Sequence, residues 1–324
     1  MPFSSFIGNE RVKQLLLRLI SERRIGQGLI FSGPRGVGKY QFALTLAQAL
    51  NCESCTDGDP CGKCPVCHRI AAGEHLDVRF VSPDGQFIKI AQTRELSLEA
   101  QFRPYEGRHR VIIVDEADRL RIEASNSILK TLEEPPELSL IVLVTSKPYA
   151  LLETIRSRCQ RVNFGPLTES ELESYLIGIA RTSDKARLLA RLARGSIGTA
   201  LAIDLDEYLD KRRVMMELLD AYFVQRDTVR LIKAAEYLGK KLEKDEFINH
   251  VDVLMTLLSD LFHLKLGKPA ESLINVDIAD RLERAAEPAT IEAIASLVER
   301  LENVLLGLAR NLSRQIAMEA ALVA

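Results

Sequence analysis

The chain has 324 residues, of which 47% are hydrophobic and 27% charged, a composition typical of a globular protein with two or three domains. The formal net charge of −2 argues against a stand-alone nucleic-acid binder, because such proteins usually carry a clear basic excess. No apolar run approaches the roughly 18 residues of a membrane span, and the start lacks the charged-then-apolar layout of a secretion signal. We therefore expect a cytoplasmic protein.

The segment from Gly28 to Lys39 predicts a phosphate-binding loop, preceded by an amphipathic helix over residues 12–20. Its apolar run 29–31 indicates a short buried strand, and the apolar residues of 42–50 have helical spacing. Between them, the sequence GPRGVGK fits the Walker A pattern G-x-x-x-x-G-K. Its glycines allow backbone N–H groups to surround phosphate oxygens, next to a helix N-terminus and a lysine. The candidate nucleotide-binding residues here are Gly33, Gly36, Gly38 and Lys39.

Tyr40 departs from this motif. It stands where Ser or Thr would hold the magnesium ion, and a phenol is too long for that contact. The loop is therefore predicted to bind phosphate but to be poorly suited to hydrolysis.

Five of the six cysteines lie between Cys52 and Cys67, which favours a metal site over a disulfide framework. Zinc in a structural site takes four ligands in a tetrahedron, and paired C-x2-C turns can supply them. Five cysteines compete for four places, so the spacing alone leaves the quartet open.

Further along, Val78–Val81, Arg110–Val114 and Leu140–Ser146 are predicted strands that alternate with helices, which implies a parallel sheet covered on both faces. Asp115 and Glu116 follow the second of these strands as a Walker B pair, which would organise magnesium and polarise the attacking water. Thr145 or Ser146 is placed either to hydrogen-bond a terminal phosphate or simply to end its strand.

Beyond residue 165 the sequence is predicted to be helical. We expect an α/β domain over 1–165 with the cysteine module at about 52–67, a small helical domain over 166–206 and an all-helical domain over 207–324. Two apolar seams with alternating spacing of three and four, over 247–261 and 291–312, indicate helix packing within a bundle. Arg158 is either a surface charge or an arginine finger for a neighbouring subunit.

Taken together, these motifs resemble the AAA+ clamp-loader subunits of bacterial DNA polymerase III, and most closely their delta-prime members. The resemblance covers about residues 3–205. The segments that carry it are Phe6–Asn9, the Walker A loop, the cysteine segment, Asp115–Asp118, residues 126–136 and Ser157–Cys159.

This resemblance assigns candidate roles to individual residues. The family's zinc pattern C-x8-C-x2-C-x2-C maps onto Cys52, Cys61, Cys64 and Cys67 and leaves Cys55 spare. Members that hydrolyse ATP carry an arginine in a Gly-Ser-x-Arg motif where this chain has Gly198. Arg158 matches the arginine that acts on a nucleotide bound by the adjacent motor subunit. Arg94 matches a helix that faces template DNA in related loaders, although a solvated helix face is an equal alternative.

The resemblance implies an AAA+ P-loop domain with a zinc module, a helical lid and a helical collar that joins the ring. The implied function is a stator-like subunit that helps to load a sliding clamp onto primed DNA and has little ATPase of its own. Its partners would be gamma/tau and delta subunits, the clamp and DNA, with structural Zn2+ and weak ATP or ADP binding. The alternatives are an ATP-hydrolysing gamma/tau-like motor and a zinc-stabilised nucleic-acid adaptor.

Overall fold

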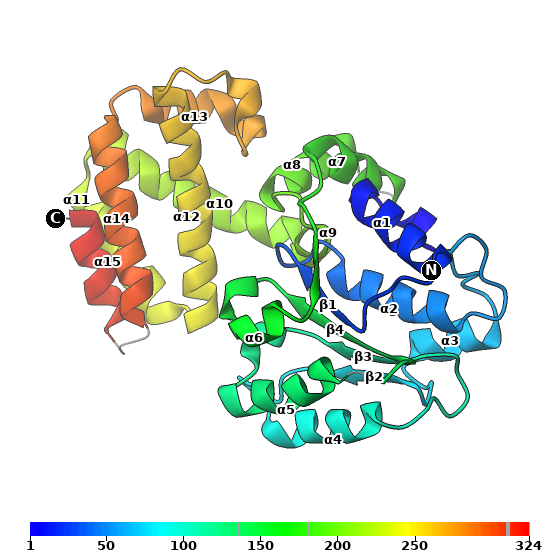
Figure 1. Ribbon diagram of the computed structural model, residues 1–324. Coiled ribbons are helices and arrows are strands. Elements are labelled where there is room, and N and C mark those ends of the chain that lie inside the picture. Colours follow the sequence, from blue (N-terminus) through cyan, green and yellow to red (C-terminus); the bar gives the residue numbers. More distant parts are fainter. Residues whose placement is uncertain (135, 180–181, 309–311, 324) are drawn as a thin grey trace. The chain divides into compact units, whose positions relative to one another are not determined.

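The computed structural model describes residues 1–134, 136–179, 182–308 and 312–323, and shows two compact units (Figure 1). The first comprises Met1–Arg181 and Ala193–Ala202, and the second comprises Thr182–Leu192 and Ile203–Ala324. The segment 166–206, predicted as a separate lid, is thus shared between them. Its helices α7 (Glu169–Gly178) and α9 (Ile197–Ala202) belong to the first unit, and α8 (Ser183–Leu192) belongs to the second.

The first unit is built on a five-stranded sheet in the order β2-β3-β4-β1-β5, and every adjacent pair is parallel. The strands are β1 (Gly28–Ser32), β2 (Val78–Val81), β3 (Arg110–Val114), β4 (Ser139–Thr145) and β5 (Gln160–Asn163). The predicted parallel sheet is confirmed. We did not predict β5, because it is an edge strand in which only Val162 is buried, and it has no apolar run.

Helices cover both faces of this sheet because its strand residues point alternately to either side (Figure 1). Leu29 and Phe31 of β1 join a core formed with α1 (Glu10–Ser21), α2 (Lys39–Asn51) and α3 (Pro65–Ala72). Ile30 joins the opposite core, formed with α4 (Ile90–Ala100), α5 (Ile122–Glu133) and α6 (Glu153–Arg156). Three short 3-10 helices complete the unit: η1 (Phe3–Ser5), η2 (Ala117–Arg119) and η3 (Pro148–Ala150).

The second unit is helical throughout its described residues. Besides α8 it contains α10 (Leu205–Leu219), η4 (Asp220–Gln225), α11 (Thr228–Glu236), η5 (Tyr237–Lys241), α12 (Lys244–Lys265), η6 (Ala270–Ser272), η7 (Val276–Ile278), α13 (Ala279–Ala286), α14 (Ile291–Gly307) and α15 (Arg314–Val323). The predicted seam 247–261 is fully buried on α12. The second seam is buried only in part: Ile294 and Leu301 lie in the core, whereas Leu312 lies beyond the end of α14 and is exposed. In the part of the chain that the structure describes, no helix is long and apolar enough to span a membrane.

Candidate functional site

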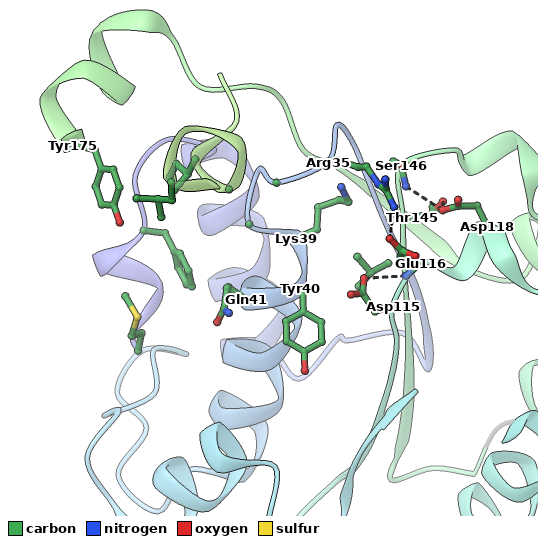
Figure 2. Close-up of a pocket in the computed structure, with 18 residues that line it drawn as sticks. Arg35, Lys39, Tyr40, Gln41, Asp115, Glu116, Asp118, Thr145, Ser146 and Tyr175 are labelled. Atoms are coloured by element: carbon green, nitrogen blue, oxygen red, sulfur yellow. Dashed lines mark hydrogen bonds and ion pairs between the residues drawn. The ribbon is translucent and has the colours of Figure 1, made fainter. Parts of the chain in front are cut away.

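A pocket of about 560 Å³ lies in the first unit, where the carboxyl ends of β1, β3 and β4 meet (Figure 2). The loop after β1 supplies Arg35, Gly36 and Gly38 to its lining, and α2 supplies Lys39, Tyr40 and Gln41. The segment after β3 supplies Asp115, Glu116 and Asp118, and the end of β4 supplies Thr145 and Ser146. The structure thus brings the Walker A and Walker B candidates together. Gly33 starts the same loop but does not line the pocket.

The helix α9 is in contact with the backbone of the phosphate-binding loop. The N–H of Gly198 donates a hydrogen bond to the Gly36 carbonyl at 2.9 Å. A Cβ atom added to Gly198 would lie 2.9 Å from the Gly36 Cα. Real Cβ atoms essentially never lie this close to another heavy atom. Gly36 itself has a φ of 70°, in the left-handed region that favours glycine. A side chain at position 198 therefore has no room in this arrangement.

Lys39 is directed at its own loop. Its Nζ donates a hydrogen bond to the Gly33 carbonyl at 2.7 Å and a second one to the Pro34 carbonyl. The side chain is buried, and this burial lowers the pKa of Lys39, while the nearby carboxylates of Asp115 and Asp118 partly offset the effect. The lysine is held beside the loop, in a position to meet a phosphate oxygen.

Tyr40 points away from Lys39 (Figure 2). Its ring centroid lies 6.0 Å from that of Phe80 on β2, so the side chain packs as part of the apolar core. Burial, and secondarily the charge of Asp115, raises the pKa of Tyr40, so the phenol stays protonated at neutral pH. The hydroxyl therefore does not replace the Ser or Thr oxygen that ligates magnesium in hydrolysing P-loop proteins.

Both acidic residues after β3 have partners in the chain. Burial raises the pKa of Asp115, whose Oδ1 accepts a hydrogen bond from the Glu116 N–H at 2.9 Å. Glu116 has a φ of 46°, and its carboxylate pairs with Arg35 of the phosphate-binding loop and with Arg119, the latter at 2.9 Å. The Glu116 carboxylate is thus engaged by two guanidinium groups of its own chain.

Thr145 is engaged inside the fold. Its hydroxyl donates to Asp118 Oδ1 at 2.6 Å and accepts the Lys147 N–H at 2.9 Å, and its side chain is buried. Ser146 is half-buried and lines the pocket, so it is the better placed of the two predicted phosphate contacts.

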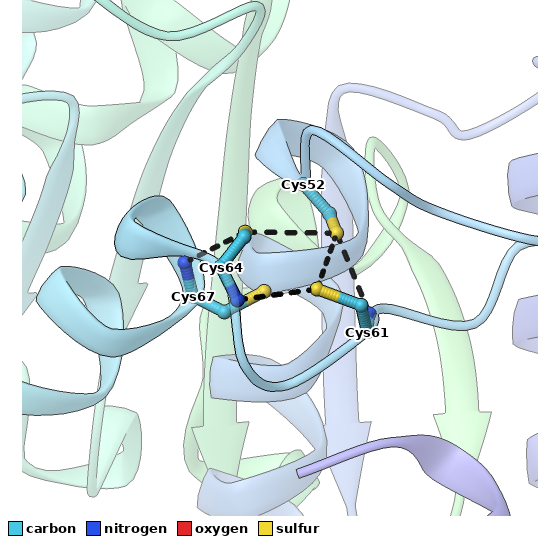
Figure 3. Close-up of side chains that lie close together, drawn as sticks. All are labelled: Cys52, Cys61, Cys64 and Cys67. Carbon is cyan, nitrogen blue, oxygen red and sulfur yellow. Dashed lines mark hydrogen bonds between the residues drawn. The ribbon is translucent and has the colours of Figure 1, made fainter.

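Four of the five clustered cysteines come together (Figure 3). The sulfur atoms of Cys52, Cys61, Cys64 and Cys67 all lie within 4.8 Å of one another, a cluster that can bind a metal ion. Backbone N–H groups point at three of the sulfurs, at 3.3 to 3.4 Å. Hydrogen bonds from N–H groups, above all that of Lys63, lower the pKa of Cys61 to about 6. Four sulfur atoms at these distances fit a closed four-ligand metal site.

Cys55 is not part of this cluster. It is half-buried against the core beneath α2, and burial raises its pKa. The loop that carries it turns at Asp57 and Gly58, which both have positive φ, and is closed by paired hydrogen bonds between Thr56 and Asp59.

Arg158 and the pocket lie at opposite ends of the strands. Arg158 precedes β5, so it lies at the amino ends of the parallel strands. The phosphate-binding loop follows β1 and lies at their carboxyl ends. The length of a five-residue strand, about 16 Å, separates these two ends. The side chain is exposed and pairs with Glu133 at 2.8 Å. Arg158 therefore cannot reach a nucleotide bound by its own chain.

Arg94 is exposed on α4 and has no ion pair or side-chain hydrogen bond within the described ranges. The helix also exposes Leu98, and Phe102 follows directly after it. Arg94 thus lies on a solvent-exposed face of α4.

Sequence reasoning missed Arg35 and Arg119 as partners of Glu116. Arg35 occupies a variable position of the Walker A motif, where any residue is allowed, so the pattern carries no signal for it. Only the folded loop brings Arg35 to an acid 81 residues away.

The fold and the site define the class of the protein. In the parallel sheet, β4 lies between the Walker A strand β1 and the Walker B strand β3, and α9 contacts the phosphate-binding loop. This arrangement is that of a P-loop domain of the AAA+ class, and the second unit is helical. Two family models match the sequence. The first model, described as "DNA polymerase III, delta subunit", matches residues 8–168. The second model, described as "DNA polymerase III, delta subunit, C terminal", matches residues 206–324. The chain belongs to the DNA polymerase III delta subunit family.

Individual relatives agree with this assignment. DNA polymerase III subunit delta' of Bacillus subtilis is 31% identical over 291 residues, which cover 89% of this chain and 87% of the relative. DNA polymerase III subunit tau of Escherichia coli is 36% identical over 207 residues, 62% of this chain and 32% of tau. Among solved structures, a DNA polymerase III gamma subunit-related protein of Thermotoga maritima is similar at 22% identity. That match covers 95% of this chain and 96% of the other, with a TM-score of 0.42. The predicted likeness to clamp-loader subunits is confirmed.

Proposed function

We propose that this chain is the delta-prime-like stator of a DNA polymerase III clamp loader, which helps to load a sliding clamp onto primed DNA. It would turn over little ATP itself and would place Arg158 at the nucleotide of a neighbouring subunit. Its partners would be gamma/tau and delta subunits in a hetero-oligomeric ring. Residues 207–324 would form the collar of that ring and residues 166–206 the lid.

The contact between Gly198 and Gly36 is the observation that carries this proposal. In hydrolysing relatives an arginine at the position of Gly198 senses the phosphate, and here the Gly36 backbone lies where a side chain at position 198 would begin. Two further features act in the same direction. Tyr40 is packed against Phe80 instead of offering a magnesium ligand, and Glu116 is held by Arg35 and Arg119. The first leaves the magnesium ligand missing and the second engages the carboxylate that would position water, and phosphoryl transfer uses both groups.

Weak nucleotide binding is compatible with this role. Gly33, Gly36, Gly38 and Lys39 provide the phosphate-binding loop, and Asp115 and Glu116 lie across the pocket. We propose ATP or ADP as the ligand class, bound without efficient hydrolysis. We also propose that Arg94 contributes to DNA contact as part of the assembled ring.

For the cysteine cluster we propose a structural Zn2+ site with Cys52, Cys61, Cys64 and Cys67 as ligands. Four sulfur ligands leave no open position for a catalytic water, so the ion would stabilise the loop between α2 and α3.

A gamma/tau-like motor is the second candidate, favoured by the 36% identity to tau over 207 residues. ATP turnover by the isolated protein separates the two functions. The stator proposal predicts turnover at background level, together with co-purification with gamma/tau and delta subunits. Robust magnesium-dependent hydrolysis that Lys39→Ala abolishes would establish the motor instead.

A further inference from the structure

Arg158 is held by two acceptors in its own chain. Its Nη2 pairs with Glu133 Oε1 at 2.8 Å, and its Nη1 donates to the Thr154 carbonyl at 3.0 Å, with a longer contact to the Ser157 hydroxyl. A guanidinium has five N–H donors. The Nε–H and one N–H of Nη2 have no acceptor among the residues described, so donors remain for a phosphate.

The backbones on both sides of this ion pair are fixed by buried neighbours. Leu132 precedes Glu133 and Cys159 follows Arg158, and both side chains are buried. They meet at Gly28, the first residue of β1, where an added Cβ would lie 2.9 Å from Leu132 Cδ2 and 2.8 Å from Cys159 Sγ. This close packing sets the position of the end of α5 relative to the start of β5.

We infer that Glu133 is a positioning residue for Arg158, an inference that rests on the proposed role of Arg158 as an arginine finger. Glu133 is anchored by Leu132 and pairs with Nη2 of the guanidinium, so it limits the rotamers that the arginine can adopt. The unused donors are thereby presented on the surface before a neighbour arrives. Because catalysis depends on orientation, a finger that has to be ordered at each turnover acts more slowly.

Glu133 differs in this respect from its neighbour Glu134. Both are exposed at the end of α5, but Glu134 has no ion pair in the part of the chain that the structure describes. E134Q therefore removes the same charge from the same surface without touching Arg158, which makes it a matched control. Exposed ion pairs contribute little to stability, so E133Q and E134Q should both fold normally.

The test is the DNA- and clamp-stimulated ATPase rate of the reconstituted loader with E133Q, R158A, the double variant or E134Q. We expect E133Q to lower kcat about two- to fivefold at the site that Arg158 serves, with KM for ATP and the melting temperature unchanged. The double variant should equal R158A, because Glu133 acts only through Arg158, and E134Q should equal the wild type.

Two results overturn the inference, and they can be told apart. If R158A is impaired while E133Q runs at or above the wild-type rate, Glu133 is not a positioning residue, and a higher rate would show that it competes with phosphate for the arginine. If R158A itself runs at the wild-type rate, the proposed finger fails and the inference fails with it. A double variant slower than R158A would also contradict the inference, since Glu133 would then act elsewhere.

Discussion

Gly36 of the phosphate-binding loop and Gly198 of α9 touch backbone to backbone. A hydrogen bond of 2.9 Å joins them, and a Cβ on Gly198 would lie 2.9 Å from the Gly36 Cα. The helix α9 thus rests directly on the backbone of the phosphate-binding loop. This contact leaves no room for a side chain at position 198 beside an otherwise almost complete Walker A loop.

Replacing Gly198 by alanine should weaken this contact. The added Cβ meets backbone, which cannot move aside as a flexible side chain would, so we expect a loss of about 1–3 kcal/mol and a lower melting temperature. Gly178→Ala is the control, because nothing lies within 4 Å of the Cβ that would be added there. Equal melting temperatures for the two variants would mean that the Gly36–Gly198 contact is not maintained in solution.

Restoring the magnesium ligand alone should not restore hydrolysis. We expect Tyr40→Thr in the isolated protein to show no ATP turnover above background, because Glu116 remains paired with two arginines and Gly198 supplies no sensing cation. The variant should also be less stable, since it loses the packing of Tyr40 against Phe80. Turnover that appears in Tyr40→Thr and disappears when Lys39→Ala is added would show that Tyr40 is the sole block.

The cysteine cluster predicts about one zinc ion per chain, since a structural site takes four ligands. Cys64→Ser should release the metal and destabilise the loop between α2 and α3, whereas Cys55→Ser should retain it, because Cys55 is outside the cluster. Metal analysis of the purified variants measures this. Loss of zinc from Cys55→Ser would mean that the quartet is wrong.

The free energy of unfolding should depend on pH through the buried carboxyl group of Asp77. Burial raises its pKa, but hydrogen bonds from Arg110 and from three backbone N–H groups outweigh this effect and hold the pKa at about 2. The folded pKa lies below the unfolded value of about 4, so the stabilisation is present above pH 4 and is lost as the pH falls towards 2.

Asp77→Asn should therefore lower the free energy of unfolding by about 2 kcal/mol at pH 7 and by less at pH 3. Urea denaturation at the two pH values measures the difference, and Asp84→Asn, at an exposed surface carboxylate, is the control. A gap between Asp77→Asn and the wild type that is equal at pH 7 and pH 3 would contradict the assigned pKa.

Most of the sheet could be predicted because its inner strands are continuous apolar runs, and runs of this kind suit only a strand buried on both faces. The strand β5 could not be predicted, because its own residues show no apolar run. It is a strand because it pairs with β1 in space. The cysteine spacing located the candidate metal site but left five cysteines for four places; the family pattern predicted that Cys55 is spare, and the fold places it outside the cluster. Likewise, the resemblance to clamp-loader subunits predicts that Gly198 stands where hydrolysing members have an arginine, whereas the contact with Gly36 depends on how α9 meets a loop some 160 residues earlier in the chain.

We propose that this subunit supports hydrolysis at a neighbour's site through Arg158, which the length of the strands separates from the pocket of its own chain. The most direct test is the DNA- and clamp-stimulated ATPase rate of a reconstituted loader that carries Arg158→Ala. Arginine fingers contribute on the order of 10³-fold at the site they serve, so that site should fall nearly silent while the others continue, and the total rate should drop substantially but not to zero. Arg158→Lys should rescue poorly, because an ammonium lacks the planar fork. A complex that assembles normally with Arg158→Ala and hydrolyses ATP at the wild-type rate would contradict the claim.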